Sequence, residues 1–87
     1  MSMDVKFTKH AEDMLIEREF ERKLIIETVL NPDLTESGEG TVWYAIKRIG
    51  QRVLRVVVSR KKKPYIVITF YYDRRLRKKL EQQEAHK

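Results

Sequence analysis

The chain contains no cysteine and only two histidines among its 87 residues. The absence of cysteine excludes disulfides and thiolate metal sites, and it is compatible with a reducing compartment. His10 and His86 are too few and too far apart to suggest a zinc site. No apolar run approaches the roughly 20 residues of a membrane span, and no signal-peptide pattern precedes the first polar helix. The sequence therefore predicts a cytoplasmic protein without a metal or another cofactor.

Charged and apolar residues are both abundant. Hydrophobic residues make up 41% of the chain and charged residues 37%, a hydrophobic content that argues against disorder throughout. The length suits one domain with a single core. We predict one domain over residues 1–87, with a core region of about residues 5–75 and a C-terminal helix or frayed tail over 76–87.

The net charge of +6 is unevenly distributed along the chain. Residues 47–63 contain eight basic side chains and no acidic one, and residues 74–79 add five more basic side chains. Such a concentration indicates an anionic partner, first a nucleic acid and second an acidic protein. A third reading is that the domain is basic without using its charge.

Residues 50–72 read as a β-hairpin of two β-branched runs, 53–59 and 65–72, joined by a basic connection. A three-residue loop at 61–63 gives the hairpin one wholly apolar face, made of Leu54, Val56, Val58, Ile66, Ile68 and Phe70. On the other face this register opposes Arg55 to Thr69 and Val53 to Tyr71. Arg55 interrupts an apolar row there, so it needs a carboxylate, a phosphate or solvent as its partner.

The first third of the chain predicts two helices. Thr8 is a candidate N-cap for a helix over about residues 8–18, after a short extended lead-in at 1–6. A second apolar stripe over 24–30 indicates another helix after a turn near residues 19–21, although a single bent helix is the alternative. Asn31 precedes Pro32, which ends the second helix.

The next segments predict a short edge strand at 34–37 and a strand at 41–49 closed by Gly50. A two-residue loop after this strand places Trp43, Ala45 and Lys47 on the core side, whereas a three-residue loop places Val42, Tyr44 and Ile46 there. We favour the three-residue loop, because the alternative buries the Lys47 ammonium without a partner. The predicted fold is α+β: two N-terminal helices packed on one face of a twisted antiparallel sheet of three to four strands, followed by a short basic C-terminal helix.

No phosphate loop, dinucleotide fingerprint, catalytic serine motif or metal-ligand cluster is present. The remaining inventory suits metal-independent RNA cleavage, in which the ribose 2'-hydroxyl attacks the neighbouring phosphate. Arg55 can bind a phosphate through two nitrogens, and His10 can act as base or acid near neutral pH. Structural roles are the alternative for several of these candidates. His10 can be a surface or capping residue, the tyrosines can serve as strand formers, and residues 60–63 can form a solvated hairpin tip that discourages edge pairing.

Four segments occur together in one order: Phe7-Thr8-Lys9-His10-Ala11, Asn31-Pro32, residues 47–58 (KRIGQRVLRVVV) and Val67-Ile68-Thr69-Phe70-Tyr71. With these segments the chain resembles a small domain family related to the RelE/ParE superfamily of bacterial and archaeal toxins. The resemblance covers about residues 5–75. It implies N-terminal helices on a twisted antiparallel sheet and a toxin of a toxin–antitoxin pair. Such toxins are often metal-independent endoribonucleases whose acidic antitoxin covers the basic surface, while others poison a topoisomerase.

The resemblance also implies site residues. Its motif positions are His10, Arg55 and Thr69, with Lys47, Arg52 and Tyr71 as weaker candidates. Two positions depart from the family pattern: Met14 stands where an arginine is common, and Glu19 stands where a glycine often follows the first helix.

The leading prediction is therefore a RelE-like ribonuclease toxin in which Arg55 binds the scissile phosphate and His10 or Tyr71 handles protons, with Thr69 beside Arg55. One alternative is a nucleic-acid-binding module without catalysis, whose phosphate contacts are Lys47, Arg52, Arg55, Lys61, Lys62 and Lys63. Another is a protein-interaction domain that binds an acidic antitoxin or a topoisomerase-like target.

Overall fold

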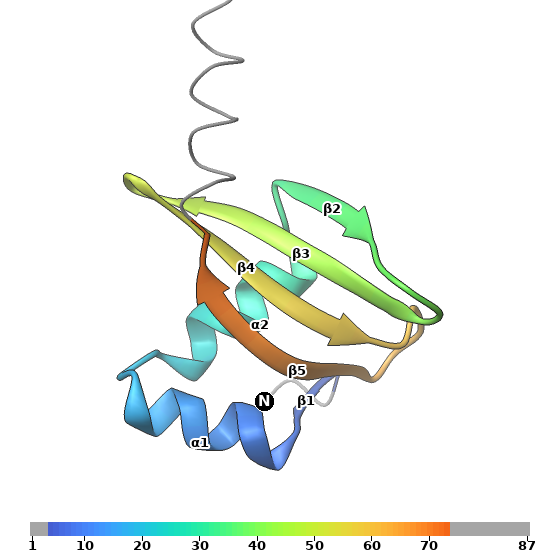
Figure 1. Cartoon of the computed structure of the whole chain (residues 1–87), viewed down its shortest axis with the longest axis horizontal. Coiled ribbons are helices and arrows are strands. Elements are labelled where there is room, and N and C mark those ends of the chain that lie inside the picture. The colour runs from blue at the N-terminus through green and yellow to red at the C-terminus, as the bar shows by residue number, and fades with distance from the viewer. Residues whose placement is uncertain (1–3, 74–87) are drawn as a thin grey trace, which may run out of the picture.

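The computed structural model describes residues 4–73 and arranges them as two helices and a five-stranded sheet (Figure 1). In chain order the elements are β1 (Val5–Phe7), α1 (Lys9–Glu17), α2 (Arg22–Leu30), β2 (Leu34–Ser37), β3 (Val42–Ile49), β4 (Arg52–Ser59) and β5 (Tyr65–Tyr72). The strand order across the sheet is β1-β5-β4-β3-β2. Strands β2 to β5 form an antiparallel meander, and β1 runs parallel to β5.

The predicted antiparallel sheet of three to four strands is wrong, because the sheet is mixed and has five strands. Its additional strand is β1, whose Val5, Lys6 and Phe7 pair with Tyr65, Ile66 and Val67. Three residues are too short to show an alternating pattern, and their parallel partner lies near the other end of the chain. The sequence therefore predicts only an extended lead-in at residues 5–7, whereas in the tertiary structure they form a strand paired with β5.

The prediction of two separate helices is confirmed. Thr8 caps α1 as expected, because its side-chain oxygen accepts a hydrogen bond from the backbone N–H of Ala11 at 3.2 Å. The Thr8 hydroxyl also donates to the Ile68 carbonyl at 3.2 Å, which ties the start of α1 to β5. Between the helices Glu19 adopts a left-handed conformation with φ of 53°. Although the sequence has no glycine there, the chain makes the turn for which glycine is usually used.

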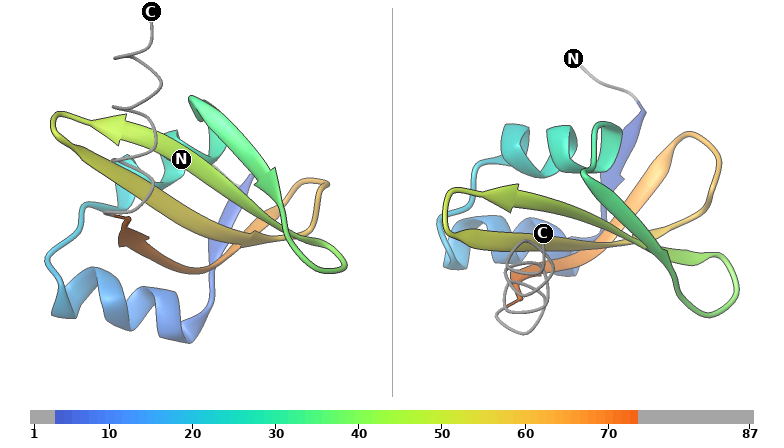
Figure 2. Two further views of the ribbon diagram at one scale, coloured as in Figure 1. Left: turned by 45° about the horizontal axis from the view of Figure 1, so that its top comes forward. Right: turned by 90° about the horizontal axis from the view of Figure 1, so that it is seen from above.

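One core joins the helices to the sheet. Helix α2 packs against β3 and β4, and α1 lies along β5 and β1 (Figure 2). The buried residues of this cluster are Val5, Ala11, Met14, Leu15, Ile25, Val29, Ala45, Leu54, Val56, Val58, Val67 and Phe70. Phe20, in the segment between the helices, adds an edge-to-face contact with Phe70 at 4.8 Å between ring centroids. The opposite side of the sheet, which we call the open face, carries a smaller cluster of Ile46 and Val53 with Tyr44.

The predicted three-residue loop between β3 and β4 is wrong. Ile49 pairs with Arg52, so the turn contains only Gly50 and Gln51, and Gly50 supplies the positive φ of 60° that such a turn requires. The one-residue difference exchanges the faces of β3: Ala45 lies in the core, while Ile46 pairs with Arg55. The two-residue loop was disfavoured in the sequence analysis because it would bury the Lys47 ammonium without a partner. Lys47 is only half-buried, and its Nζ donates to the backbone carbonyl of Asn31 at 3.1 Å, at the C-terminal end of α2.

The predicted hairpin of β4 and β5 exists, but its register differs. Val56 pairs with Phe70 and Val57 with Thr69, after which a β-bulge leaves Ile68 unpaired and Val58 pairs with Val67. The bulge moves the side chains of one end of β5 to the other face. Leu54, Val56, Val58 and Phe70 are buried as predicted, whereas Val67 replaces Ile66 and Ile68 in the core.

The predicted C-terminal helix at 76–87 lies outside the described residues. Within residues 4–73, neither helix has the length and hydrophobicity that crossing a membrane requires.

Candidate nucleic-acid interface

Arg55 occupies the centre of the open face and has two carboxylate partners. Its Nη1 donates to Oδ2 of Asp73 at 3.0 Å, and its Nη2 donates to Oε1 of Glu36 at 3.1 Å. The guanidinium carbon lies 4.4 Å from the centroid of the Tyr44 ring, and Tyr71 pairs with Arg55 on the neighbouring strand. We call Glu36, Tyr44, Arg55, Tyr71 and Asp73 the Arg55 cluster. A carboxylate thus fills the need that the sequence indicated for Arg55.

The charges of the Arg55 cluster affect what it can bind. Burial lowers the pKa of Arg55, but the hydrogen bond to Asp73 and the electrostatic contributions of Tyr71, Glu36 and Asp73 outweigh it, so the pKa is raised overall. One arginine and two carboxylates carry a formal charge of about −1 at neutral pH. A phosphate would have to displace a carboxylate from Arg55 and would meet the remaining negative charge.

The other predicted catalytic residues do not form one site with Arg55. Thr69 pairs with Val57, and its hydroxyl donates to Sδ of Met14 at 3.0 Å. Tyr71 takes the place opposite Arg55 that the sequence assigned to Thr69. His10 is exposed in the first turn of α1. Within residues 4–73 no hydrogen bond or ion pair joins His10 to any of these three residues.

The predicted nucleic-acid-binding residues fall into two groups at opposite ends of β4. Strand β4 has 8 residues, so its ends are roughly 23 Å apart at about 3.3 Å per residue. At the end near Gly50, Lys47 bonds Asn31, and the guanidinium carbon of Arg52 lies 4.9 Å from the Tyr72 ring centroid. Lys61, Lys62 and Lys63 lie at the other end, in the connection between β4 and β5. The five residues therefore do not form one continuous patch.

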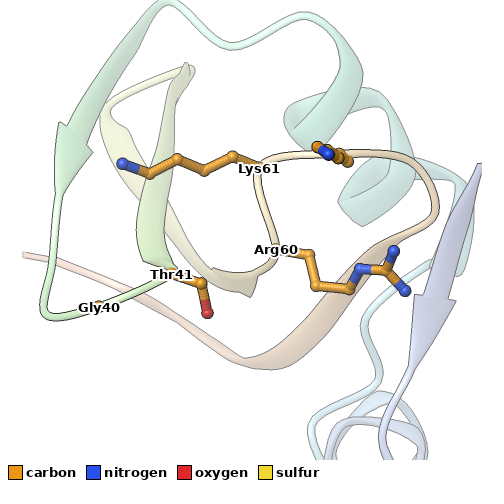
Figure 3. Close-up of a pocket in the computed structure, with 5 residues that line it drawn as sticks. Gly40, Thr41, Arg60 and Lys61 are labelled. Carbon is orange, nitrogen blue, oxygen red and sulfur yellow. The ribbon is translucent and has the colours of Figure 1, made fainter.

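The end of the sheet beside this connection contains a shallow hollow of about 390 Å³ (Figure 3). Its lining residues come from the loop before β3 and from the connection between β4 and β5: Gly40, Thr41, Arg60, Lys61 and Lys62. We call it the hairpin-end hollow. Three of these five residues are basic and none is acidic. Lys61 extends on the side of Gly40 and Thr41, and Arg60 leaves the chain in the opposite direction (Figure 3).

Neighbouring residues hold the backbone around the hollow in place. The indole Nε1 of Trp43 donates to the Arg60 carbonyl at 2.8 Å, and the Trp43 ring meets the Tyr65 ring edge-on at 5.6 Å. Lys63 Nζ contacts Asp4 Oδ2 at 3.3 Å, so this lysine is partly neutralised. Among the described residues no carboxylate pairs with Arg60, Lys61 or Lys62. The connection thus presents three solvated cations on an anchored backbone.

Sequence reasoning missed Glu36, Tyr44 and Asp73 as partners of Arg55, and Gly40 and Thr41 as part of the hollow. The only signal in the sequence was the position of Arg55 within an apolar row. It indicated that Arg55 needs a partner, but it did not identify the residues that provide one. Strand order supplies the partners, because it places β2 and the end of β5 within reach of β4. Residues 4–73 contain no group of three histidine, aspartate or glutamate side chains arranged to hold a metal ion.

Comparisons with known proteins found one family. Curated proteins gave no match, and solved structures gave none either. Nothing in these comparisons links the chain to the RelE/ParE superfamily, so that resemblance stays a prediction. Residues 7–72, which run from the end of β1 to the end of β5, match a family model described as Domain of unknown function (DUF4258), and the chain belongs to this family.

Proposed function

We propose that this domain binds nucleic acid, with RNA as the expected ligand, through the hairpin-end hollow. The observation that carries the proposal is the set of three basic side chains, Arg60, Lys61 and Lys62, that line one hollow without a carboxylate partner in residues 4–73. Phosphate contacts dominate the affinity of proteins for nucleic acids, and solvated lysines and arginines supply such contacts at little desolvation cost. A cytoplasmic location, expected from the sequence, would give the domain access to RNA.

The test removes two of these charges and compares the result with an equal change elsewhere. The variant Lys61→Gln/Lys62→Gln alters the hollow, and Lys9→Gln/Lys23→Gln removes two exposed lysines from the helices. We expect the first variant to weaken RNA binding and to make the slope of log affinity against log salt shallower by about 2, and the control to change neither. Fluorescence anisotropy over a salt series measures both quantities. Equal weakening in the two variants would mean that only net charge matters.

A second candidate is metal-independent RNA cleavage at the Arg55 cluster. The observation in its favour is that two carboxylates and Tyr71 surround Arg55 on the open face. A carboxylate can accept the proton of the 2'-hydroxyl, an arginine can stabilise charge on the phosphorane, and a tyrosine can protonate the leaving oxygen. We rank cleavage second because Arg55 already has two anionic partners. His10 and Thr69 have no assigned part in it.

Incubation of the purified protein with RNA in excess EDTA separates cleavage from binding. Cleavage predicts fragments with 2',3'-cyclic phosphate ends, and Glu36→Gln and Arg55→Lys should each reduce their rate without a matching loss of RNA affinity. Binding without cleavage predicts intact RNA whose affinity still depends on Lys61 and Lys62. Intact single-stranded and structured RNA, with no growth arrest on expression, would remove the toxin-like ribonuclease from consideration.

A protein partner remains a further proposal for the same basic surface. If the domain belongs to a toxin–antitoxin pair, its partner would be an acidic antitoxin. The antitoxin would contact the same cations as RNA and would therefore compete with RNA for them. A topoisomerase-like target would instead bind without RNA. Co-purification with an acidic protein encoded beside this chain, lost in Lys61→Gln/Lys62→Gln, would favour the antitoxin.

A further inference from the structure

Arg60, the first residue after β4, has a backbone conformation that is unfavourable for a residue with a side chain. Its φ is 74°, in the left-handed region. There the Cβ atom of an L-residue crowds the following carbonyl oxygen, whereas glycine has no Cβ and avoids this cost. Gly40 and Gly50 supply the positive φ in the loops before and after β3. A glycine at position 60 would therefore suit the turn better than an arginine does.

Arg60 is held in this conformation through its backbone. The indole Nε1 of Trp43 donates to the Arg60 carbonyl at 2.8 Å, and the Trp43 ring packs against the Tyr65 ring. The Arg60 side chain is exposed, and within residues 4–73 it forms no hydrogen bond, ion pair or ring contact with another residue. Contacts in the described part of the fold therefore do not explain an arginine at this strained position.

The backbone conformation also sets the direction in which the Arg60 guanidinium leaves the chain. Lys61 extends on the side of Gly40 and Thr41, whereas Arg60 extends in the opposite direction (Figure 3). Arg60 contributes to the lining of the hairpin-end hollow, but its side chain is presented on a different side of the connection from Lys61. With a negative φ, the Cα–Cβ bond of residue 60 would point elsewhere relative to the anchored carbonyl. Residues held in unfavourable backbone conformations are concentrated at functional sites.

We propose that Arg60 binds an RNA phosphate through two hydrogen bonds, and that its left-handed backbone directs the guanidinium to that phosphate. This inference rests on the RNA-binding function proposed above and assigns different roles to its cations. A planar guanidinium matches two oxygens of a phosphate, whereas an ammonium acts as a point charge. The anchored backbone orients Arg60 before binding, so less conformational freedom is lost in the complex. Lys61 and Lys62 add charge that attracts the nucleic acid without fixing its position.

The first experiment changes the shape of the cation and keeps its charge. Arg60→Lys should weaken RNA binding roughly tenfold, the factor that corresponds to one lost hydrogen bond to a charged group. The slope of log affinity against log salt should stay constant, because the number of charges is unchanged. Arg18→Lys, at an exposed arginine directly after α1, is the matched control and should bind RNA as the unsubstituted protein does. Fluorescence anisotropy over a salt series measures both quantities.

Two outcomes of this comparison have different meanings. If Arg60→Lys binds as tightly as the unsubstituted protein while Lys61→Gln/Lys62→Gln is weakened, this inference is overturned and RNA binding stands. If the unsubstituted protein binds no RNA, the proposed function itself is contradicted.

The second experiment separates the stability of the connection from its affinity. Arg60→Gly removes both the backbone strain and the guanidinium. We expect its urea midpoint to rise by roughly 0.5 M. Its RNA affinity should fall roughly tenfold or more, and its salt slope should become shallower by about 1. Glu19→Gly relieves a second positive φ, of 53°, and should raise the midpoint without weakening RNA binding.

Either of two results with Arg60→Gly would overturn the inference. A higher midpoint with unchanged RNA affinity would show that the strained arginine does not serve RNA binding. A lower midpoint would show that the arginine side chain supports the fold.

Discussion

Arg55 donates a hydrogen bond from Nη1 to Oδ2 of Asp73 at 3.0 Å, and this contact joins the middle of β4 to the residue that follows β5. Through its other amino group the same guanidinium reaches Glu36 in β2, across the intervening strand β3. Arg55 therefore ties an edge strand and the end of β5 to the centre of the sheet. Its role in stability is distinct from any role in function, and the two can be measured separately.

Replacing Arg55 should destabilise the fold. Arg55→Met retains a similar apolar stem but leaves two carboxylates without their cation, the largely buried Asp73 and the partly exposed Glu36. We expect the free energy of unfolding to fall by about 1–3 kcal/mol in urea denaturation. The double variant Arg55→Met/Asp73→Asn should recover part of this loss. Arg60→Met, at an exposed arginine of the connection, serves as the control and should cost about 0.5 kcal/mol or less.

Lys47 should contribute to stability through the end of α2. Its ammonium bonds the Asn31 carbonyl, one of the acceptors that a helix C-terminus leaves without an internal partner. Lys47→Met keeps an unbranched side chain at this half-buried position of β3 and removes the charged donor. We expect a loss of about 0.5–1.5 kcal/mol in the free energy of unfolding. An unchanged urea midpoint would show that water replaces this contact at no cost.

Trp43 should affect RNA binding without touching the ligand. Trp43→Phe keeps an aromatic ring against Tyr65 but removes the indole N–H that holds the Arg60 carbonyl. We expect RNA affinity to fall by about threefold to tenfold, because the connection loses its anchor and must be ordered on binding. The salt slope should stay constant, since no cation is removed. A slope that became shallower by about 1 would contradict this explanation.

The contact between Glu12 and Arg22 predicts a dependence of stability on pH. The hydrogen bond from Arg22 lowers the pKa of Glu12, against a smaller opposing effect of burial. Because folding lowers this pKa, the contact stabilises the fold above the ordinary pKa of glutamate, and the stabilisation is lost as the pH falls through the lowered value. Both side chains are about half exposed, so we expect only about 0.5 kcal/mol.

Urea denaturation of Arg22→Gln at about pH 7 and about pH 3 tests this dependence, with Lys23→Gln as a neighbouring control. The stability difference between the unsubstituted protein and Arg22→Gln should shrink at the lower pH. The contact of Arg22 with the Phe7 ring does not titrate, so the part of the difference that persists at low pH measures it. A gap that is the same at both pH values would exclude any contribution from Glu12.

Local patterns were sufficient to predict the two helices, the N-cap at Thr8, the strands β3 to β5 and the side of β4 that carries Leu54, Val56 and Val58. Each depends on residues close in sequence: an apolar stripe, a capping hydroxyl, or alternation along one strand. The same alternation placed Arg55 on the face opposite the main core and showed that it needs a partner. The concentration of basic residues in 47–63 was also evident from the sequence.

Tertiary structure alone decided the parallel partner of β1, the bulge at Ile68, the register of β3 and the two carboxylates beside Arg55. The partner of β1 and the carboxylates beside Arg55 come from segments separated along the chain, whereas the bulge and the β3 register are one-residue differences within hairpins that alternation in a single sequence does not settle. The helix end at Asn31 made the rejected register acceptable by giving Lys47 an acceptor. Strand order brought Glu36 and Asp73 to Arg55, and it separated Lys47 and Arg52 from Lys61, Lys62 and Lys63. The sequence therefore determined which side chains carry the charge, and the fold determined which of those charges are left for a ligand.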